Sequence, residues 1–357
     1  MNKRNVPINK GNYSMDTAER EALFEQYRGD GWEQEYAEYR RKWSECPQQQ
    51  QVLEYPLLVD IELSSVCNLT CPMCYTITDE FKRQVNVTRM NWELYMKIID
   101  EIGGKVPALR LSLRGEATLH TKFIEAIKYA KDCGIKEVSL LTHGGKLTLP
   151  FFQKMVEAGV DWITISIDGV GDTYERVRKP LKFNALLDKI KAIKQYKDEH
   201  QLKRPVIKVQ GIWPAIAESG VDVYYDTFKS CTDLVAFNPL IDYLSNDKHI
   251  EYLEEFTCPQ QYQRLVIGAD GLVMKCSNDE ENREVIGDIK QETVHQVWHG
   301  EKMQAVRNMH LQPRGFMQSA VCRKCYLPRK TEDEEAQLGE RTFIVRNYIH
   351  RIQLIGK

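Results

Sequence analysis

Short apolar runs alternate with amphipathic stretches through most of the chain, and this alternation is what most constrains the fold. Six runs have the length and composition of buried strands, at residues 57–63, 108–113, 137–142, 162–167, 205–212 and 234–237. Segments with helical periodicity lie between them, at residues 91–102, 122–133, 149–158 and 185–196. Repeated strand–helix units predict an α/β fold with a parallel sheet and helices outside, closed or nearly closed into a barrel.

Residues whose side chains could bind a ligand or take part in catalysis follow these runs at their carboxyl ends. Three cysteines come after residue 63, Gly115 and Glu116 after residue 113, His143 after residue 142 and Asp168 after residue 167. Parallel sheets of this kind bind ligands at the carboxyl ends of their strands. Because those ends meet along one edge of the sheet, the sequence predicts a single site built from several strand ends.

The three cysteines are Cys67, Cys71 and Cys74, with the spacing C-x3-C-x2-C. Three close thiolates can hold three irons of a [4Fe–4S] cube and leave the fourth iron without a protein ligand. The next cysteine, Cys133, lies fifty-nine residues further along the chain. The spacing alone leaves two alternatives open: a zinc site whose fourth ligand comes from elsewhere, and a chance group of buried thiols.

This arrangement resembles the radical S-adenosylmethionine (radical SAM) enzymes, whose signature is C-x3-C-x-Φ-C, with Met73 at the Φ position. The resemblance implies a partial (β/α)6 TIM-like barrel. It also implies that the open iron binds the amino and carboxylate groups of SAM. One electron from the cluster would then cleave SAM to methionine and a 5′-deoxyadenosyl radical, which abstracts hydrogen from a substrate.

The segment Arg114-Gly115-Glu116-Ala117 resembles the Gly-Gly-Glu-Pro turn of that family, from which it departs at Arg114 and Ala117. By resemblance, the backbone of Gly115 and the carboxylate of Glu116 contact the SAM amino group. His143 and the two glycines after it resemble an Asn-Gly turn near the ribose. For His143 itself, a substrate contact and a turn residue with positive φ stay equally open.

Ser166 lies at the end of the fourth apolar run and Arg178 comes after it, and the resemblance implies that both hold the SAM carboxylate. A planar guanidinium is the natural bidentate partner of a carboxylate, which agrees with that role for Arg178. Two alternatives remain. Ser166 and Asp168 would instead cap the next helix, and Arg178 would be a solvated surface charge.

A second set of cysteines lies near the C-terminus: Cys258, Cys276, Cys322 and Cys325. Their pattern, C-x12-G-x4-C followed by C-x2-C, resembles the SPASM extension of radical SAM enzymes or its shorter form, twitch. Four cysteines imply one auxiliary [4Fe–4S] cluster that is fully ligated and therefore transfers electrons. A zinc ribbon is the alternative. The segment 263–274 is predicted to form a hairpin that turns at 269–271.

Composition indicates an intracellular enzyme. The 357 residues are 42% hydrophobic, which is enough for one large domain with smaller attachments. The net charge of −2 provides no basic field for nucleic acid. No apolar stretch is long enough to cross a bilayer, and the first residues contain no signal peptide. Clustered cysteines therefore predict metal ligation in the cytoplasm, with Cys46, Cys133 and Cys231 as bystanders.

The chain divides into four predicted parts. They are a helical extension (1–56), the barrel (57–245), a small iron–sulfur domain of SPASM/twitch type (246–330) and a tail (331–357). Aromatic residues at helical spacing over 17–43 predict a helix packed on the body of the protein, with a dimer contact or a substrate lid as alternatives. We expect a linker at 48–51, an exposed acidic segment at 331–339 and a closing helix or strand over 341–357.

The resemblance implies a radical SAM oxidoreductase that uses a flavodoxin- or ferredoxin-type reductant. A fully ligated second cluster suits removal of an electron from a substrate radical, and oxidation of a carbinol to a ketone is the simplest such reaction. We expect a small polar metabolite, such as a sugar or an aminocyclitol, because no leader-peptide-binding domain is expected before the barrel. Position alone suggests Tyr75, Arg114, Gln210 and Asn238 as substrate contacts.

Two other classes of function remain. One is modification of a peptide or protein side chain by oxidation, epimerisation or cross-linking. The other is a non-enzymatic iron–sulfur or zinc protein.

Overall fold

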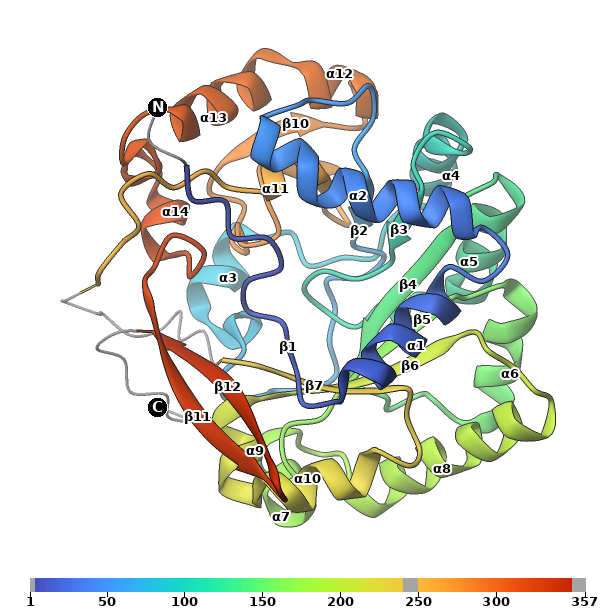
Figure 1. Cartoon of the computed structure of the whole chain (residues 1–357). Helices are drawn as coiled ribbons and strands as arrows, with labels where there is room; N and C mark the ends of the chain where they lie inside the picture. The colour runs from blue at the N-terminus through green and yellow to red at the C-terminus, as the bar shows by residue number, and fades with distance from the viewer. Residues whose placement is uncertain (1–3, 240–249, 349–357) are drawn as a thin grey trace.

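A computed structural model describes residues 4–239 and 250–348 of the chain, and a single large sheet dominates it (Figure 1). Six of its strands are parallel and neighbour one another in chain order. They confirm the six predicted strands: β2 (Leu58–Ile61), β3 (Ala108–Arg110), β4 (Glu137–Thr142), β5 (Trp162–Ser166), β6 (Val206–Ile212) and β7 (Leu234–Asn238).

Four further strands extend the sheet on both sides, so that it holds ten strands in the order β1-β7-β6-β5-β4-β3-β2-β8-β9-β10. β1 (Tyr13–Ser14) pairs antiparallel with β7, and β8 (Arg264–Ile267) pairs parallel with β2. β9 (Leu272–Met274) and β10 (Val285–Asp288) follow antiparallel. The sheet is therefore open. In a closed barrel, β7 and β2 would form hydrogen bonds with each other. Here β1 pairs with the free edge of β7, and β8 pairs with the free edge of β2.

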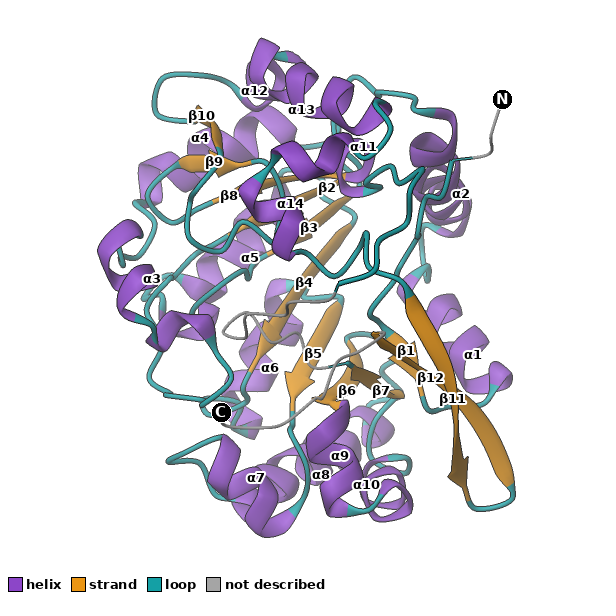
Figure 2. Cartoon of the chain, turned by 90° about the vertical axis from the view of Figure 1, so that its left-hand side faces the viewer, coloured by secondary structure: helices purple, strands orange, loops and turns teal. Residues whose placement is uncertain are grey.

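Helices cover the outer face of the sheet (Figure 2). The four predicted helices are present as α4 (Trp92–Ile102), α5 (Phe123–Asp132), α6 (Leu149–Ala158) and α8 (Phe183–Glu199). They are joined by the shorter helices α3 (Asp79–Gln84), α7 (Gly171–Val177), α9 (Trp213–Ser219) and α10 (Val221–Phe228). Alternate strand residues such as Val59, Leu109 and Ile163 are fully buried and belong to the core.

The residues that alternate with these core residues along each strand face the inside of the curved sheet. Successive side chains of a strand point to opposite faces, so the inner face carries the residues between the buried aliphatic ones. Many of these are polar or charged: Asp60, Glu62, Arg110, Ser112, Glu137, Ser139, Thr164, Ser166, Lys208, Gln210 and Arg264. The chain thus builds a sheet with an apolar outer face and a polar inner face.

Two helices, not one, precede β2: α1 (Ala18–Arg28) and α2 (Glu33–Gln49). The predicted continuous helix is wrong because Gly29 ends α1 and Gly31, at a φ of +80°, reverses the chain before α2. The linker predicted at 48–51 is also wrong at its start, since α2 continues to Gln49. The aromatic residues pack on the sheet as predicted, in a cluster of Trp32, Tyr36, Tyr39, Trp43, Leu57, Leu58 and Ala108.

The C-terminal part lies against the same sheet. β8 and β9 form the predicted hairpin, and α11 (Gln260–Gln263), α12 (Val294–His299), α13 (Glu301–Leu311) and α14 (Ala320–Lys324) surround it. The predicted domain boundary at 245 lies outside the described residues. β11 (Thr331–Leu338) and β12 (Arg341–Tyr348) form a separate hairpin, so the closing segment is a strand up to residue 348. Residues 349–357 also lie outside the described part.

No helix in the described ranges has the length and apolarity to cross a membrane.

Candidate functional site

The first three cysteines lie on an irregular loop that follows β2. Cys71 is buried and Cys67 and Cys74 are half-buried; none forms a disulfide. Burial raises the pKa of Cys67 and raises that of Cys71 to about 11, and the charges of neighbouring cysteines in the loop add to both effects. The three thiols therefore lie close together. In this environment they favour the protonated form unless a cation compensates their charge.

Gly115 lies directly against this loop. A Cβ atom at this position would come within 2.5 Å of the Ser64 carbonyl oxygen, so a larger side chain would push the loop away. The next residue continues the contact, because the Glu116 amide donates a hydrogen bond of 2.9 Å to the Val66 carbonyl. The turn after β3 and the start of the cysteine loop are thus packed together, and this packing requires glycine.

The Glu116 carboxylate is 2% exposed and ties the turn to the end of β4. It accepts hydrogen bonds from the Thr118 hydroxyl (2.6 Å), the Thr142 hydroxyl (2.7 Å) and the His143 amide (3.0 Å). These three donors hold the carboxylate in one orientation beside the cysteine loop.

His143 connects the end of β4 to the cysteine loop. Its Nδ1 accepts from the Gly145 amide (3.0 Å), so its Nε2 carries the proton and donates to the Asn68 side-chain oxygen (2.8 Å). Burial lowers the pKa of His143, which keeps the ring neutral. The positive φ of this turn belongs to Gly144, at +75°. The interpretation of His143 as the turn residue with positive φ is therefore wrong.

Arg178 and Asp168 form an ion pair at the ends of α7 and β5. Arg178 Nε lies 2.6 Å from Asp168 Oδ2, and the other carboxylate oxygen accepts from the Ile212 amide (2.9 Å). The Arg178 side chain is 17% exposed, and its charge acts on Cys67 and Cys71. Arg178 is therefore a partly buried cation that faces the cysteine loop, and not a solvated surface charge.

Ser166 lies on the inner face at the end of β5, opposite Gln210 of β6. Neither Ser166 nor Asp168 caps the next helix, because the N-cap of α7 is Val170 and no side chain bonds to it there.

Arg114, the first departure from the Gly-Gly-Glu-Pro pattern, is completely buried in an ion pair with Glu62. Two of its nitrogens lie 2.7 and 2.6 Å from the two Glu62 oxygens. A third donates to the Asn282 side chain (2.7 Å) and to the Glu280 carbonyl (3.2 Å), in the loop between β9 and β10. Arg114 thus joins the end of β2 to the C-terminal part of the protein.

The four C-terminal cysteines are brought together although three different segments supply them. Cys258 precedes α11, Cys276 follows β9, and α14 provides Cys322 with Cys325 as its C-cap. All four are buried. Burial, followed by the charges of the other cysteines, raises the pKa of Cys258 and of Cys325 to about 12.

Nitrogen donors point at these sulfurs. Lys275 Nζ lies 3.2 Å from Cys322 Sγ and 2.6 Å from a Glu284 oxygen, and Asn278 donates to Cys325 Sγ at 3.1 Å. His310 Nε2 lies 3.7 Å from Cys322 Sγ. Burial acts to lower the pKa of Lys275, but the charges of Cys322 and Cys276 outweigh it and raise that pKa.

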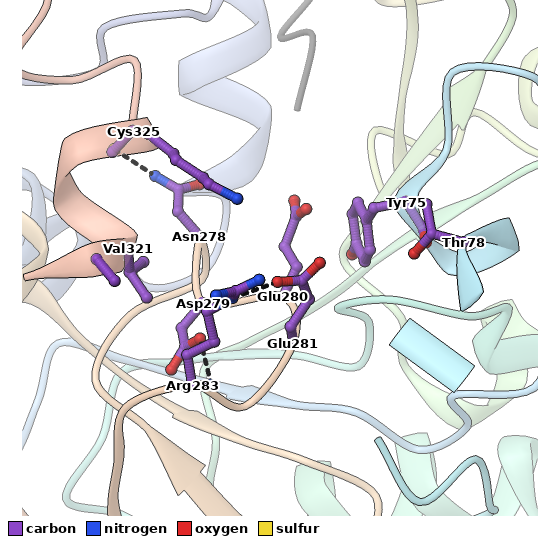
Figure 3. Close-up of a pocket in the computed structure, with 11 residues that line it drawn as sticks. Tyr75, Thr78, Asn278, Asp279, Glu280, Glu281, Arg283, Val321 and Cys325 are labelled. Atoms are coloured by element: carbon purple, nitrogen blue, oxygen red, sulfur yellow. Dashed lines mark hydrogen bonds and ion pairs between the residues drawn. The ribbon is translucent and has the colours of Figure 1, made fainter. Parts of the chain in front are cut away.

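A pocket separates the two cysteine regions (Figure 3). Tyr75 and Thr78, just after the first set, line one side. Asn278, Arg283 and Cys325 belong to the other side, which the loop after β9 and the end of α14 provide.

Comparison with known proteins finds two matching domains. The radical SAM superfamily matches residues 61–203, and the SPASM iron–sulfur cluster-binding domain matches residues 258–326. The chain carries a radical SAM domain followed by a SPASM domain. These two domains imply a [4Fe–4S] cluster that binds SAM and auxiliary iron–sulfur binding near the C-terminus.

Curated relatives share short regions with the radical SAM domain. A cofactor-modifying protein for tungsten-containing aldehyde ferredoxin oxidoreductase from Pyrococcus furiosus is 28% identical over 154 residues, 42% of each chain. A 7,8-dihydro-6-hydroxymethylpterin dimethyltransferase from Methanocaldococcus jannaschii is 28% identical over 32% of this chain and 23% of its own. PqqA peptide cyclase from Bradyrhizobium diazoefficiens is 30% identical over 32% and 29%. The chain spans less than half the length of these relatives.

Solved structures share the fold. BtrN in complex with AdoMet and 2-DOIA has a TM-score of 0.52 at 16% identity, covering 76% of this chain and 92% of BtrN. Streptococcus suis SuiB bound to precursor peptide SuiA has a TM-score of 0.53 at 11% identity, covering 82% and 75%. At these identities the likeness concerns the fold alone.

The residues of both domains fit iron–sulfur clusters. Around the SPASM cysteines, a buried ammonium and side-chain N–H groups contact two of the four sulfurs, those of Cys322 and Cys325. Thiolates with net negative charge require such donors. Among the described residues, no three Cys, His, Asp or Glu side chains converge closely enough to hold one metal ion. A cubane cluster spaces its ligands more widely than a single ion does.

Several residues of the radical SAM domain and of the SPASM domain were not predicted. Sequence reasoning missed Asn68, Thr142 and Glu62 as partners of the motif residues, and it missed Lys275 as a donor to sulfur. Asn68 and Lys275 have a local signal, since Asn68 follows Cys67 and Lys275 precedes Cys276. The predicted SAM contacts Met73, Gly115, Glu116, Ser166 and Arg178, and the predicted metal ligands, stay predictions; Met73 itself is half-buried in the loop.

Proposed function

We propose that the protein is a radical SAM enzyme that abstracts hydrogen from a small polar metabolite and oxidises a carbinol to a ketone. One auxiliary [4Fe–4S] cluster, held by Cys258, Cys276, Cys322 and Cys325, would serve as the electron relay. The observation that carries this proposal is a polar chamber inside the curved sheet, which adjoins the SPASM cysteines.

The chamber is a cavity of about 430 Å³, within the usual size of small-molecule sites. Its walls are the inner faces of β2 to β8, with Arg110, Thr164 and Gln210 among the lining residues. Helices α1 and α2 and the segment around Asn12 close the amino end of the strands. A space bounded on so many sides suits a metabolite better than an extended peptide.

The chamber adjoins the auxiliary site through Tyr326, which follows Cys325. Tyr326 packs on the N-terminal segment, where a Cβ at Gly11 would lie 2.8 Å from its ring. Its hydroxyl is also close enough to Arg264 and Arg110, in the chamber wall, for their charges to affect one another. A substrate in the chamber would therefore lie near the auxiliary cysteines, which supports electron transfer between them.

When bound, the first cluster supplies the electron that converts SAM to methionine and a 5′-deoxyadenosyl radical, and the second accepts an electron. The chain's own residues do the positioning. Glu116 and Arg178 offer a carboxylate and a guanidinium beside the cysteine loop, matched to the amino and carboxylate groups of SAM. For a carbinol, the carbon-bound hydrogen atom goes to the radical, the hydroxyl proton to solvent and the remaining electron to the acceptor.

Peptide modification is the second candidate. The match to PqqA peptide cyclase favours it, as does the pocket between the two cysteine regions, which would admit a side chain from outside. Against it stand the names of two other relatives, a cofactor-modifying protein and a pterin dimethyltransferase.

The test is anaerobic reconstitution followed by assay with deuterated substrates. We expect about eight irons per chain, the content of two [4Fe–4S] clusters, and 5′-deoxyadenosine from SAM and dithionite. Deuterium should pass into 5′-deoxyadenosine from a polyol or aminocyclitol carrying it at a carbinol carbon. No 5′-deoxyadenosine would refute the enzyme proposal, and deuterium transfer only from peptides would favour the second candidate.

A further inference from the structure

A single lysine, Lys208, lines the chamber. Lys208 lies in the middle of β6 on the inner face, where it pairs in register with Thr164 of β5 and Leu234 of β7. It lines the cavity together with both of these neighbours. Only 7% of the residue is exposed. A buried ammonium in such a place normally has an acceptor, because an unpaired buried charge is costly.

Lys208 has no such acceptor: across residues 4–239 and 250–348, its ammonium makes no hydrogen bond and no ion pair. The nearby carboxylates already have partners. Glu137 accepts two hydrogen bonds from Arg28, at 2.9 and 3.0 Å. Glu25 accepts one from Arg28 at 2.9 Å and another from the Tyr36 hydroxyl.

The two other cations on this face share one carboxylate. Arg110 Nε lies 2.8 Å from Asp60 Oδ1, and Arg264 Nη1 lies 3.2 Å from Asp60 Oδ2. Asp60 itself is completely buried. The charged residues that line the chamber, counted together with Asp60 behind them, carry one positive charge in excess, and Lys208 is the cation without a partner. They are Glu21, Glu25, Arg28, Arg40, Arg110, Glu137, Lys208 and Arg264.

Two uncharged hydrogen-bond donors also belong to the wall of the chamber. Trp162 Nε1 and the Tyr13 hydroxyl are buried without a hydrogen-bond partner, and both residues line the chamber. Burial, together with the charge of Arg28, lowers the pKa of Lys208 to about 8, so the ammonium is still charged at neutral pH. An anionic group in the chamber would find an unpaired cation in an enclosed place.

We propose that Lys208 binds an oxyanion, a carboxylate or a phosphate, carried by the substrate. The inference deepens the proposed function and rests on it. It assigns the chamber a substrate with a charged end, which a plain polyol lacks.

The register of the sheet gives this substrate a direction. Gln210 is the next inward residue of β6, about 7 Å nearer the carboxyl end, and it pairs with Ser166, the predicted SAM contact. If its anionic group binds Lys208, the rest of the substrate would extend past Gln210 toward the carboxyl ends of the strands, where the predicted SAM contacts lie. This anion site is distinct from Arg178, which lies beyond the end of the strands.

The test uses inorganic phosphate and succinate as probes on the reconstituted full chain, with calorimetric titration as the measurement. We expect millimolar binding of at least one probe to the wild type, and binding at least about 10-fold weaker to Lys208→Met. Lys208→Arg, which keeps the charge, should retain most of the binding. The matched control is Lys154→Met on the exposed side of α6, which should bind like the wild type.

A second measurement needs no variant. Lys208 in the wild type should react with acetic anhydride, as detected by mass spectrometry of its peptide, and the probe that binds should slow this reaction. Preference for phosphate or for succinate names the anion of the substrate. No binding of either probe, equal binding to Lys208→Met, or no protection would overturn the proposal. Production of 5′-deoxyadenosine by the same wild-type sample tests the proposed function separately.

Discussion

The two cysteine regions of this protein differ in how far they are closed. Cys67, Cys71 and Cys74 lie on an irregular loop, and two of them remain half-exposed. The four SPASM cysteines are all buried and are anchored by α11, β9 and α14. Three ligands on an open loop suit a cluster that binds a small molecule, and four buried ligands suit one that only passes electrons.

The charges around the two regions differ in the same way. Lys275 is a buried cation in contact with a cysteine sulfur, and Glu284 balances it. Near the open loop, Arg178 is paired with Asp168 but keeps part of its side chain exposed. A closed site thus satisfies its charges internally, whereas an open site retains a charge for its ligand.

The largest effect is expected from the open region. Replacing Cys67, Cys71 and Cys74 together with alanine should reduce 5′-deoxyadenosine formation to the level of a sample without enzyme, because the iron that binds SAM loses its cluster. About four irons per chain should remain in the SPASM domain. Chromatography and iron analysis measure both values, and Cys231→Ala, a buried thiol outside either set, is the control. Undiminished SAM cleavage would show that these three cysteines do not hold the SAM-binding cluster.

The closed region should behave differently. Replacing Cys322 and Cys325 with alanine should stop product formation. SAM should still be cleaved to 5′-deoxyadenosine, because the first cluster is intact. The ratio of product to 5′-deoxyadenosine measures this, and in the wild type it should be near one. Normal product from the variant would contradict the assignment of the second cluster to electron transfer.

Arg114 joins the two regions, so its removal tests whether they depend on each other. Arg114→Met leaves the Glu62 carboxylate buried and unpaired, which should lower the free energy of unfolding by about 3–5 kcal/mol. Urea unfolding of the reconstituted chain measures this change. The double variant Arg114→Met/Glu62→Gln should recover part of the loss, because no charge is then left unpaired. An unchanged unfolding midpoint in the single variant would show that the pair does not stabilise the fold.

The smallest effect concerns Lys208, the buried lysine without an acceptor. The folded chain should release its proton near pH 8, whereas the unfolded chain keeps it to about pH 10.5. The cost of burying the charge is therefore full at pH 7 and disappears as the pH rises from 8 to 10.5. Lys208→Met should stabilise the chain by about 1–3 kcal/mol at pH 7.

This advantage of Lys208→Met should vanish near pH 10.5. Thermal unfolding at several pH values measures it, with Lys154→Met as a variant that should show no such dependence. A pH-independent difference would mean that the chamber solvates Lys208 fully.

Much of the architecture followed from local patterns. The six strands, the four main helices and the hairpin at β8 and β9 were predicted because apolar periodicity and turn residues act over a few neighbours. One error came from the same local view. Nothing in the aromatic spacing of 17–43 indicated that Gly31 would reverse the chain. The partial barrel was predicted correctly, but nothing within its strands indicated that β1 and β8 would occupy its two edges.

The candidate site was predicted only as far as its motifs reach. The seven cysteines and Glu116 stand at spacings that a sequence displays directly, and the structure gathers them into two groups. The alternating polar residues of the strands, such as Asp60 and Glu62 or Lys208 and Gln210, were also visible in the sequence. The strand predictions rested on the apolar residues between them. Whether the polar residues line a packed core or a chamber depends on the folded structure.

The ligand spacings, the order of the strands along the chain and the two domains that the cysteines mark can be read from the amino-acid sequence. Which charges meet depends on the folded structure. Arg114 and Glu62 are 52 residues apart, and Lys275 and Cys322 are 47 residues apart. Such pairs form because charges interact through space. The partner of a buried ion, or its absence at Lys208, is set by how the strands and loops pack and not by their neighbours in the chain.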